Sequence, residues 1–313
     1  MPKVLITGIN GFVGQHLTRE LTRQGHQVDG LIHGSKLAPD IRGSVAKYTV
    51  CDIADRRAVF QLDLSSYDVI VNLAGLASYG KSFAAPKHYM EVNADAVKNI
   101  CLRMSDQASK SRLLTISSGV VYDPRQSLPF YETSKTANQA SPYTASKLHM
   151  EQIVTSYINK GLDCLIIRPF NHIGPGQSAG FLVHDLCQQL LQVAAGAKDS
   201  VIVGNLASRR DYSDVRDVVK AYAQLAFAKP KILTSHVYNV CSGVSQSGQA
   251  ILEELQKHIP GSQQAHLVVD SKLLRPDDPE ELRGSHDLLS KDIGWQPKVP
   301  FEQTLEDIVH SIS

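Results

Sequence analysis

The sequence predicts an α/β protein of the Rossmann type, a doubly wound parallel sheet with a smaller C-terminal α/β lobe. Over the first 170 residues, short apolar segments alternate with amphipathic helical segments, which is typical of parallel strands covered by helices on both faces. A glycine-rich turn follows the first apolar segment. After residue 170 the pattern changes to a loop rich in Gly and Pro, followed mainly by helices.

The expected elements follow from these patterns in order along the chain. Strands are expected at residues 3–7, 27–32, 48–50, 69–73, 113–117 and 164–167, with helices at 15–24, 92–104 and 146–158. Beyond a loop at 171–180, helices are expected at 183–195, 213–227, 247–257 and 300–312, with a short strand at 237–240. We therefore expect a dinucleotide-binding domain at 1–170 and a second lobe at 171–313, with some chain crossing back to the first domain.

The composition excludes several classes of partner. The 32 Lys and Arg residues balance 31 Asp and Glu residues, which argues against binding to nucleic acid or to an anionic membrane surface. No apolar run approaches the roughly 18 residues of a membrane-spanning helix. The five Cys are scattered without a CxxC pair, so we expect free thiols and no metal site. With no signal-peptide pattern at the start, the expected location is the cytoplasm.

The glycine-rich turn reads G-x-x-G-x-x-G between a strand and a helix. Its first two glycines permit close approach of a diphosphate to the backbone, and the third lets the helix pack closely on the strand. The free N–H groups at the start of the helix would bind the anion. The alternative is a turn that merely requires glycine. The turn residues assigned to cofactor binding are Gly8, Asn10, Gly11, Phe12, Val13 and Gly14.

The end of the second strand indicates which cofactor is used. An NAD-binding site normally has an acid about 20 residues beyond the glycines, where it binds the ribose diol. This chain has His33, Ser35 and Lys36 there instead. We therefore favour NADP(H), with Ser35 or Lys36 holding the 2′-phosphate, while NAD(H) use stays possible. Lys36 as a solvated loop charge is an equal alternative.

Residues after the next strands complete the expected cofactor site. Asp52 lies where its carboxylate would reach the adenine amino group, and small residues after the fourth strand would let the backbone lie against the cofactor. The residues assigned on this basis are Asp52, Ile53, Leu73, Ala74, Gly75, Asn93 and Pro169.

Candidate catalytic residues lie around a Y-x-x-x-K pair. Tyr143 and Lys147 are four residues apart, so they share one face of a helix. A nearby ammonium favours the phenolate, which makes tyrosine a usable acid–base. Ser118 follows the strand expected at 113–117, where its hydroxyl would bind a substrate oxygen. The alternatives are a half-buried packing role for Tyr143 and a helix-capping role for Ser118.

These residues, in this order, resemble the extended short-chain dehydrogenase/reductase family that acts on nucleotide sugars. The resemblance covers essentially the whole chain. It implies that Ser118, Tyr143 and Lys147 form the catalytic triad, with Tyr143 as proton donor or acceptor and Lys147 also binding the nicotinamide ribose. It further implies a homodimer joined through the helices at about 92–104 and 146–158.

Later motifs resemble those of GDP-4-keto-6-deoxy-D-mannose reductases. The matching stretches are RPFNHIGPGQ from Arg168, RDYSDVRD from Arg210, YNVCSG from Tyr238, LRP from Leu274, GS from Gly284 and GWQP from Gly294. This resemblance implies that Asn171 contacts the sugar or phosphate and that Arg210 and Arg275 bind the diphosphate of a GDP-linked sugar. Each arginine could instead form a surface or interlobe salt bridge.

One departure from the family narrows the expected chemistry. Val120 occupies the position where 4,6-dehydratases carry a Glu and GDP-fucose synthase a Cys, and valine cannot move a proton. His184 does not obviously match the second acid–base group of the synthase, and Asp123 replaces a usual Gly.

The resemblance therefore implies reduction of GDP-4-keto-6-deoxy-D-mannose to GDP-D-rhamnose or to its 6-deoxy-D-talose epimer. A nucleotide-sugar 4-epimerase with retained NAD(P) and a non-catalytic NADP(H)-binding sensor are the alternatives.

Overall fold

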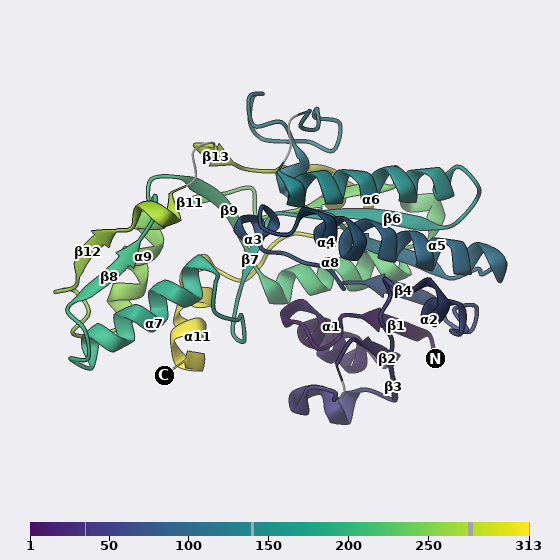
Figure 1. The fold of residues 1–313 in the computed structure, drawn as a ribbon, viewed down its shortest axis with the longest axis horizontal. Helices are drawn as coiled ribbons and strands as arrows, with labels where there is room; N and C mark the ends of the chain where they lie inside the picture. The colour runs from purple at the N-terminus through teal and green to yellow at the C-terminus, as the bar shows by residue number, and fades with distance from the viewer. Residues whose placement is uncertain (35, 139–140, 275–277, 313) are drawn as a thin grey trace.

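Seven parallel strands form the main sheet of the computed structural model, which describes residues 1–34, 36–138, 141–274 and 278–312 (Figure 1). Their order is β10-β6-β5-β4-β1-β2-β3. The strands are β1 (Lys3–Thr7), β2 (Gln27–Ile32), β3 (Lys47–Val50), β4 (Val69–Asn72), β5 (Arg112–Ile116), β6 (Cys164–Pro169) and β10 (Val237–Val240). The order reverses between β1 and β4, so the crossovers run outward in both directions. The predicted doubly wound Rossmann fold is confirmed.

Helices cover both faces of this sheet. On one face α1 (Phe12–Arg23) packs beside α8 (Val215–Phe227), and on the other α5 (Ala96–Asp106) packs beside α6 (Pro142–Ile158) and α2 (Arg56–Phe60). Each face of the sheet has its own hydrophobic core, and successive residues of β1 point to opposite faces. Ile6 packs in the core on the α1 and α8 side, whereas Leu5 packs in the core on the α5 side. The near-continuous apolar strands of the sequence reflect burial on both faces.

The largest differences between expected and observed helix starts are at α6 and α5. α6 begins at Pro142 rather than at residue 146, because Ser141 caps it by accepting a hydrogen bond from the amide of Thr144 at 3.1 Å. Proline is suited to the first helical position, where its missing N–H is not needed. α5 begins at Ala96 because a π-helical turn, Glu91–Asp95, occupies the first part of the expected segment.

The second lobe lies at the left of Figure 1 and contains two small sheets. One is built on β9 (Arg209–Asp214), which pairs with β7 (Asn171–Ile173), β11 (Ser245–Ser247) and β13 (Glu281–Leu282); the other pairs β8 (Ser200–Val203) with β12 (His266–Val269). The helices α7 (Leu182–Ala194), α9 (Gly248–His258) and α11 (Phe301–Ile312) pack together in this lobe. The prediction of a loop at 171–180 is wrong for residues 171–173, because a three-residue strand is too short to show periodicity.

Part of the chain after residue 170 returns to the main sheet. α8 covers one face of the sheet, β10 extends its edge beside β6, and α10 (Asp287–Ile293) packs against β10. The remaining short helices are α3 (Tyr79–Ser82), α4 (Pro86–Met90) and the 3-10 turns Pro39–Ser44, Gly119–Val121, Pro230–Ile232 and Ser271–Leu273.

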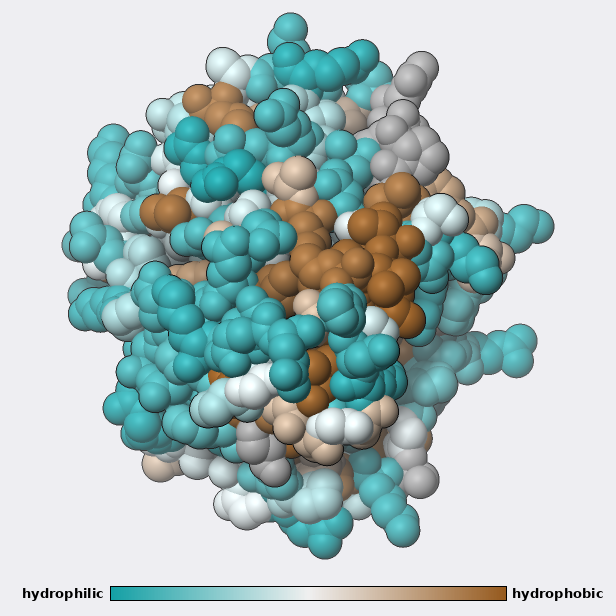
Figure 2. Space-filling model, turned by 90° about the vertical axis from the view of Figure 1, so that its left-hand side faces the viewer, coloured by the Kyte–Doolittle hydropathy of each residue, from teal (hydrophilic) through white to brown (hydrophobic). Residues whose placement is uncertain are grey.

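Exposed apolar side chains gather on the surface of the second lobe. Ile202 on β8 and Leu267, Val268 and Val269 on β12 are all at least 44% exposed, and Figure 2 shows an apolar patch on the side of the molecule where these strands lie. None of the described helices is long and apolar enough to cross a membrane.

A buried carboxylate ties the C-terminal segment to α8, the helix that covers one face of the main sheet. Asp217 on α8 accepts hydrogen bonds from the amides of Lys298 at 2.6 Å and Val299 at 2.7 Å, and its backbone carbonyl accepts one from the Trp295 indole. Asp217 is 1% exposed. This carboxylate therefore holds the segment just before α11 against α8.

We expect Asp217→Ala to lower the free energy of unfolding by about 2–4 kcal/mol, because two amides lose a charged acceptor. Lys220→Ala removes the cation that pairs with Asp217 at 3.1 Å from a partly exposed position, and should cost less than about 1 kcal/mol. Urea denaturation measures both. Equal losses in the two variants would contradict this role of Asp217.

Candidate active site

The glycine turn packs against the end of β4. Gly8 has a φ of +65°, and a Cβ placed on it would lie 2.8 Å from the amide nitrogen of Ala74. A Cβ on Gly14 would lie 2.5 Å from the carbonyl oxygen of Gly8. No side chain fits at either position, and no acid lies in the first turn of α1. The turn therefore has the form of a phosphate cradle at a helix N-terminus.

Asn10 holds the segment after β2 beside this turn. Its amide group donates to the carbonyl oxygen of Lys36 at 2.9 Å and accepts from the amide of Ala38 at 2.9 Å. Lys36 is thereby kept next to the glycine turn with an exposed side chain. The exposed His33 lies 3.8 Å from the carboxylate of Asp52. Ser35, also assigned to this site, lies outside the described residues.

The end of β4 links the cofactor side to the catalytic helix. Leu73 and Ala74 lead into Gly75, where a Cβ would lie 2.9 Å from the side-chain oxygen of Asn93 and 3.6 Å from Nζ of Lys147. Asn93 accepts a hydrogen bond from the amide of Leu76 at 2.8 Å and donates to the hydroxyl of Ser146 at 3.0 Å. The predicted Asn93, Gly75 and Lys147 are therefore neighbours.

Other residues assigned to the cofactor site lie along the same edge. Phe12 stacks on His172 of β7, with 6.2 Å between the ring centroids, so the start of α1 touches the strand that follows β6. Ile53 and Pro169 are buried, and Val13 packs partly against the core on the α1 side.

The structure brings Tyr143, Lys147 and Ser118 together. Tyr143 lies in the first turn of α6, and Nζ of Lys147 donates to the carbonyl oxygen of Ile116 at 2.8 Å. Burial raises the pKa of the Tyr143 phenol, and its hydrogen bond with Ser118 partly offsets that rise. Burial lowers the pKa of Lys147 to about 8, against the opposing charge of Glu151. Ser118 also caps the following turn through the amide of Val120 at 3.4 Å, so the capping role expected from the sequence is present.

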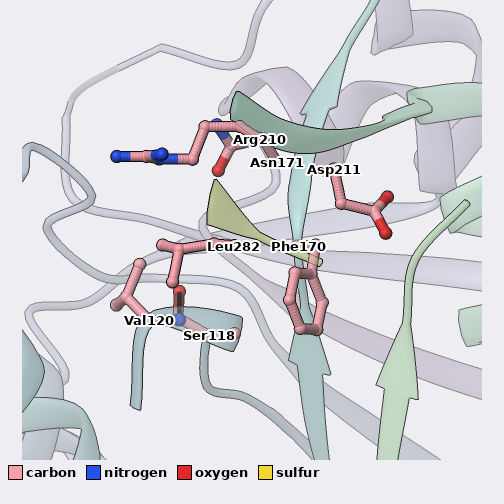
Figure 3. Close-up of a pocket in the computed structure, with 8 residues that line it drawn as sticks. Ser118, Val120, Phe170, Asn171, Arg210, Asp211 and Leu282 are labelled. Atoms are coloured by element: carbon pink, nitrogen blue, oxygen red, sulfur yellow. Dashed lines mark hydrogen bonds between the residues drawn. The ribbon is translucent and has the colours of Figure 1, made fainter. Parts of the chain in front are cut away.

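A pocket opens beside Ser118 between the two lobes (Figure 3). Its lining residues are Ser118, Gly119, Val120, Phe170, Asn171, Arg210, Asp211 and Leu282. Two of the residues assigned to substrate, Asn171 and Arg210, are therefore in the same pocket as Ser118. Arg275, the third, lies outside the described residues.

Arg210 is already paired in this structure. Its guanidinium donates to Asp278 at 2.7 Å and to the carbonyl oxygen of Pro279 at 2.9 Å. The side chains of Arg210 and Asp278 are 13% and 14% exposed. The salt-bridge alternative is thus present, and it leaves the guanidinium on the wall of the pocket.

Asp211 is directed away from Ser118 and Val120 (Figure 3). Its carboxylate accepts hydrogen bonds from the amides of Ser242 at 2.8 Å and Gly243 at 2.9 Å and from the hydroxyl of Ser242 at 2.7 Å. Burial nevertheless raises the pKa of Asp211 to about 6. The sequence motif included Asp211, but only the structure reveals this anchoring of the chain after β10.

Asp123 and His184, the two unassigned residues, have local partners. The guanidinium of Arg125 hydrogen-bonds Asp123 and holds the pKa of its carboxyl at about 2. His184 lies 3.5 Å from Asp185 on α7. Within the described ranges, no group of three His, Cys, Asp or Glu side chains is arranged to hold a metal ion.

The buried pair Glu151 and Arg168 was missed as part of the site. Glu151 lies four residues after Lys147 on α6, and Arg168 lies on β6 with Nη2 2.6 Å from the Glu151 carboxylate. The four-residue spacing from Lys147 was a usable signal. Arg168 belonged to a matching stretch, but no sequence pattern linked it to Glu151.

Comparison with known proteins shows the family of this chain. A sequence profile of the GDP-mannose 4,6 dehydratase family matches residues 5–308. The chain is 29% identical to GDP-6-deoxy-D-mannose reductase of Pseudomonas aeruginosa over 98% of this chain and 96% of that protein. It is 26% identical to UDP-glucose 4-epimerase of Neisseria meningitidis serogroup B, over 98% and 96% of the two chains.

Solved structures also match this chain over nearly its whole length. The structure of RMD from Pseudomonas aeruginosa complexed with NADPH matches with a TM-score of 0.84 and 28% identity, over 99% of this chain and 98% of that one. TunA, a NAD-dependent NDP-hexosamine 5,6-dehydratase, matches with a TM-score of 0.85 and 26% identity, over 100% and 98%. The chain belongs to the GDP-mannose 4,6 dehydratase family, within the extended short-chain dehydrogenases/reductases that use a nicotinamide cofactor on nucleotide sugars.

Proposed function

We propose that this enzyme reduces the 4-keto group of a nucleotide-linked 4-keto-6-deoxyhexose, with GDP-4-keto-6-deoxy-D-mannose as the first candidate. The supporting observation is the composition of the pocket beside Ser118 and Tyr143. Among its described lining residues the one carboxylate, Asp211, is engaged by backbone amides, and Val120 stands where a second base would be. A pocket of this kind suits carbonyl reduction, which needs a single proton donor.

The residues present fit a dinucleotide. Gly8 and Gly14 let the turn pack tightly against β4 and against the start of α1, and the first turn of α1 offers its amides without a competing acid. Bound NADPH would supply the hydride that adds to C4 of the ketone. Tyr143 would then give its proton to O4, with Ser118 donating a hydrogen bond to the same oxygen. Lys147, close to Gly75 and Asn93, would hold the ribose and favour the resulting phenolate.

The diphosphate of the sugar nucleotide would bind Arg210, with Asn171 contacting the sugar or phosphate. Because Arg210 pairs with Asp278 in this structure, the diphosphate would replace that carboxylate on the guanidinium. Arg275 remains part of the proposal on the resemblance alone. Remote contacts of this kind orient the ketone without taking part in the chemistry.

A nucleotide-sugar 4-epimerase is the second candidate, because UDP-glucose 4-epimerases match over nearly the whole chain. The same Tyr143 and a retained cofactor would serve both reactions. An epimerase consumes no cofactor overall, so stoichiometric use of NADPH distinguishes the two.

With GDP-4-keto-6-deoxy-D-mannose, we expect stoichiometric loss of reduced-nicotinamide absorbance, and NMR of the product C4 proton assigns the rhamno or talo configuration. Tyr143→Phe should lower kcat by at least about 100-fold and leave the NADPH dissociation constant within about twofold. The control Tyr131→Phe makes the same change at a tyrosine that is 46% exposed. Full activity of Tyr143→Phe would refute the assigned role. No NADPH loss with the ketone, together with 4-epimerisation of UDP-glucose without net cofactor use, would favour the epimerase.

We expect NADPH to be preferred over NADH, because the end of β2 lacks an acid and Asn10 holds Lys36 beside the glycine turn. Lys36→Ala should weaken NADPH binding by about tenfold, the loss of one exposed charge-assisted contact to a 2′-phosphate, and leave NADH binding unchanged. Fluorescence titration measures both constants. The control is Lys47→Ala, which changes an exposed lysine at the start of β3. If NADPH and NADH binding respond alike, Lys36 is a solvated loop charge.

A further inference from the structure

Three charged side chains are buried together beneath the candidate catalytic centre. Lys147 and Glu151 lie on α6 and Arg168 lies on β6, and they are 8%, 7% and 6% exposed. Charges in such positions lose their hydration, so each needs well-placed partners. A merely adventitious cluster would be strongly destabilising.

The Glu151 carboxylate is held on two sides. Arg168 donates from Nη2 to one oxygen at 2.6 Å and from Nε to the other at 2.9 Å, a bidentate pair. The hydroxyl of Ser117 donates to the latter oxygen at 2.5 Å. Ser117 directly precedes Ser118 in the chain. The residue before Ser117 is Ile116, whose carbonyl oxygen accepts the hydrogen bond from Lys147. The carboxylate thus joins the catalytic helix to the ends of β5 and β6.

Arg168 is fixed in turn from its far side. Its Nη1 donates to the phenol oxygen of Tyr122 at 3.1 Å, and that phenol donates to Asn239 on β10 at 2.6 Å. The backbone amide of Asn239 donates to the carboxylate of Glu132 at 2.9 Å. Burial raises the pKa of Glu132. The guanidinium is therefore oriented toward Glu151 by buried partners on other elements.

The groups facing Lys147 differ in charge. α6 itself contributes Tyr143 and Glu151, α4 contributes Tyr89, whose ring meets that of Tyr143 edge-on, and β6 contributes Arg168 behind Glu151. Of these groups Glu151 alone is a carboxylate, and its charge is the one that favours the protonated form of Lys147.

The nearby π-helical turn and β5 present neutral groups to the same lysine. Asn93 lies across Gly75, and the carbonyl oxygen of Ile116 accepts from Nζ. The turn's acids, Glu91 and Asp95, are not buried. Glu151 is therefore the counter-charge for the Lys147 ammonium.

We propose that Glu151, fixed by Arg168 and Ser117, is a positioning residue that keeps Lys147 charged and in place beside Tyr143. The inference rests on the proposed reductase function, because it concerns the residues that would deliver the proton. The competing explanation is a structural ion pair that only joins α6 to β6.

Glu151→Gln tests the charge while keeping the shape and an acceptor oxygen. Without the negative charge Lys147 should lose its proton more readily, so activity should fail at a lower pH. We expect the high-pH limb of the plot of kcat against pH to shift to lower pH by about one unit, which lowers kcat at pH 8.5 by roughly tenfold. The KM for the sugar nucleotide should stay within about twofold of the wild-type value. Glu254→Gln, which removes the partner of the exposed Lys257, should leave the profile in place.

A double variant separates charge from structure. Glu151→Gln leaves Arg168 buried without its partner and lowers the melting temperature, whereas Glu151→Gln with Arg168→Met removes both charges. If Glu151 positions Lys147 through its charge, the double variant keeps the shifted limb while regaining stability. If the pair is only structural, the double variant regains the wild-type profile, which overturns the proposal. The double variant alone decides the matter if the single one does not fold.

Binding of NADPH provides a measurement that does not depend on turnover. We expect the NADPH dissociation constant, followed by fluorescence, to rise with pH as Lys147 loses its proton, and to rise about one pH unit earlier in Glu151→Gln. A shifted binding profile in a chain that does not reduce the ketone would keep the positioning role and reject the proposed function. Reduction by the wild type with no shift in either profile would do the reverse.

Discussion

The parallel pairing of β1, β4, β5 and β6 determines where the candidate site residues lie. Parallel strands deliver the residues that follow them to the same edge of the sheet. The glycine turn follows β1, Gly75 lies just beyond β4, Ser118 follows β5 and Asn171 follows β6. Because these strands are buried on both faces, their register is strongly constrained. The site thus inherits its geometry from the strand order and from the apolar cores on the two faces of the sheet.

The same edge requires buried charge. A tyrosine that is to give up a proton in a dry site needs a cation nearby, yet burial itself drives that cation toward neutrality. Lys147 shows the conflict, since burial lowers its pKa while Glu151 acts in the opposite direction. Adding a carboxylate creates another buried charge, which Arg168 pairs in a bidentate way. This series of buried partners extends to β10, a strand that the polypeptide forms after it leaves the second lobe.

Much of this arrangement could be predicted from sequence, and the reasons are local. Alternation of apolar segments and the glycine turn indicated a doubly wound parallel sheet with the glycine turn after its first strand, and the four-residue spacing placed Tyr143 and Lys147 on one helix face. The missed features are contacts between distant segments: β7 with β9, Arg210 with Asp278, and Asp217 with the segment before α11. No spacing rule links residues about 40 to 80 positions apart, because their meeting depends on the whole chain path.

If Arg210 binds the diphosphate of the substrate as proposed, specificity depends on the partner that Arg210 loses as well as on the one it gains. The Asp278 pair means that the guanidinium is not left unpaired before substrate binds, so an incoming diphosphate contributes only the difference between two anionic partners. A diphosphate offers more negative charge and more acceptor oxygens than one carboxylate, and it therefore wins the exchange. A neutral sugar offers no such advantage and leaves Asp278 in place. On the proposed function, the salt bridge between Arg210 and Asp278 would therefore act as a filter for the charged substrate.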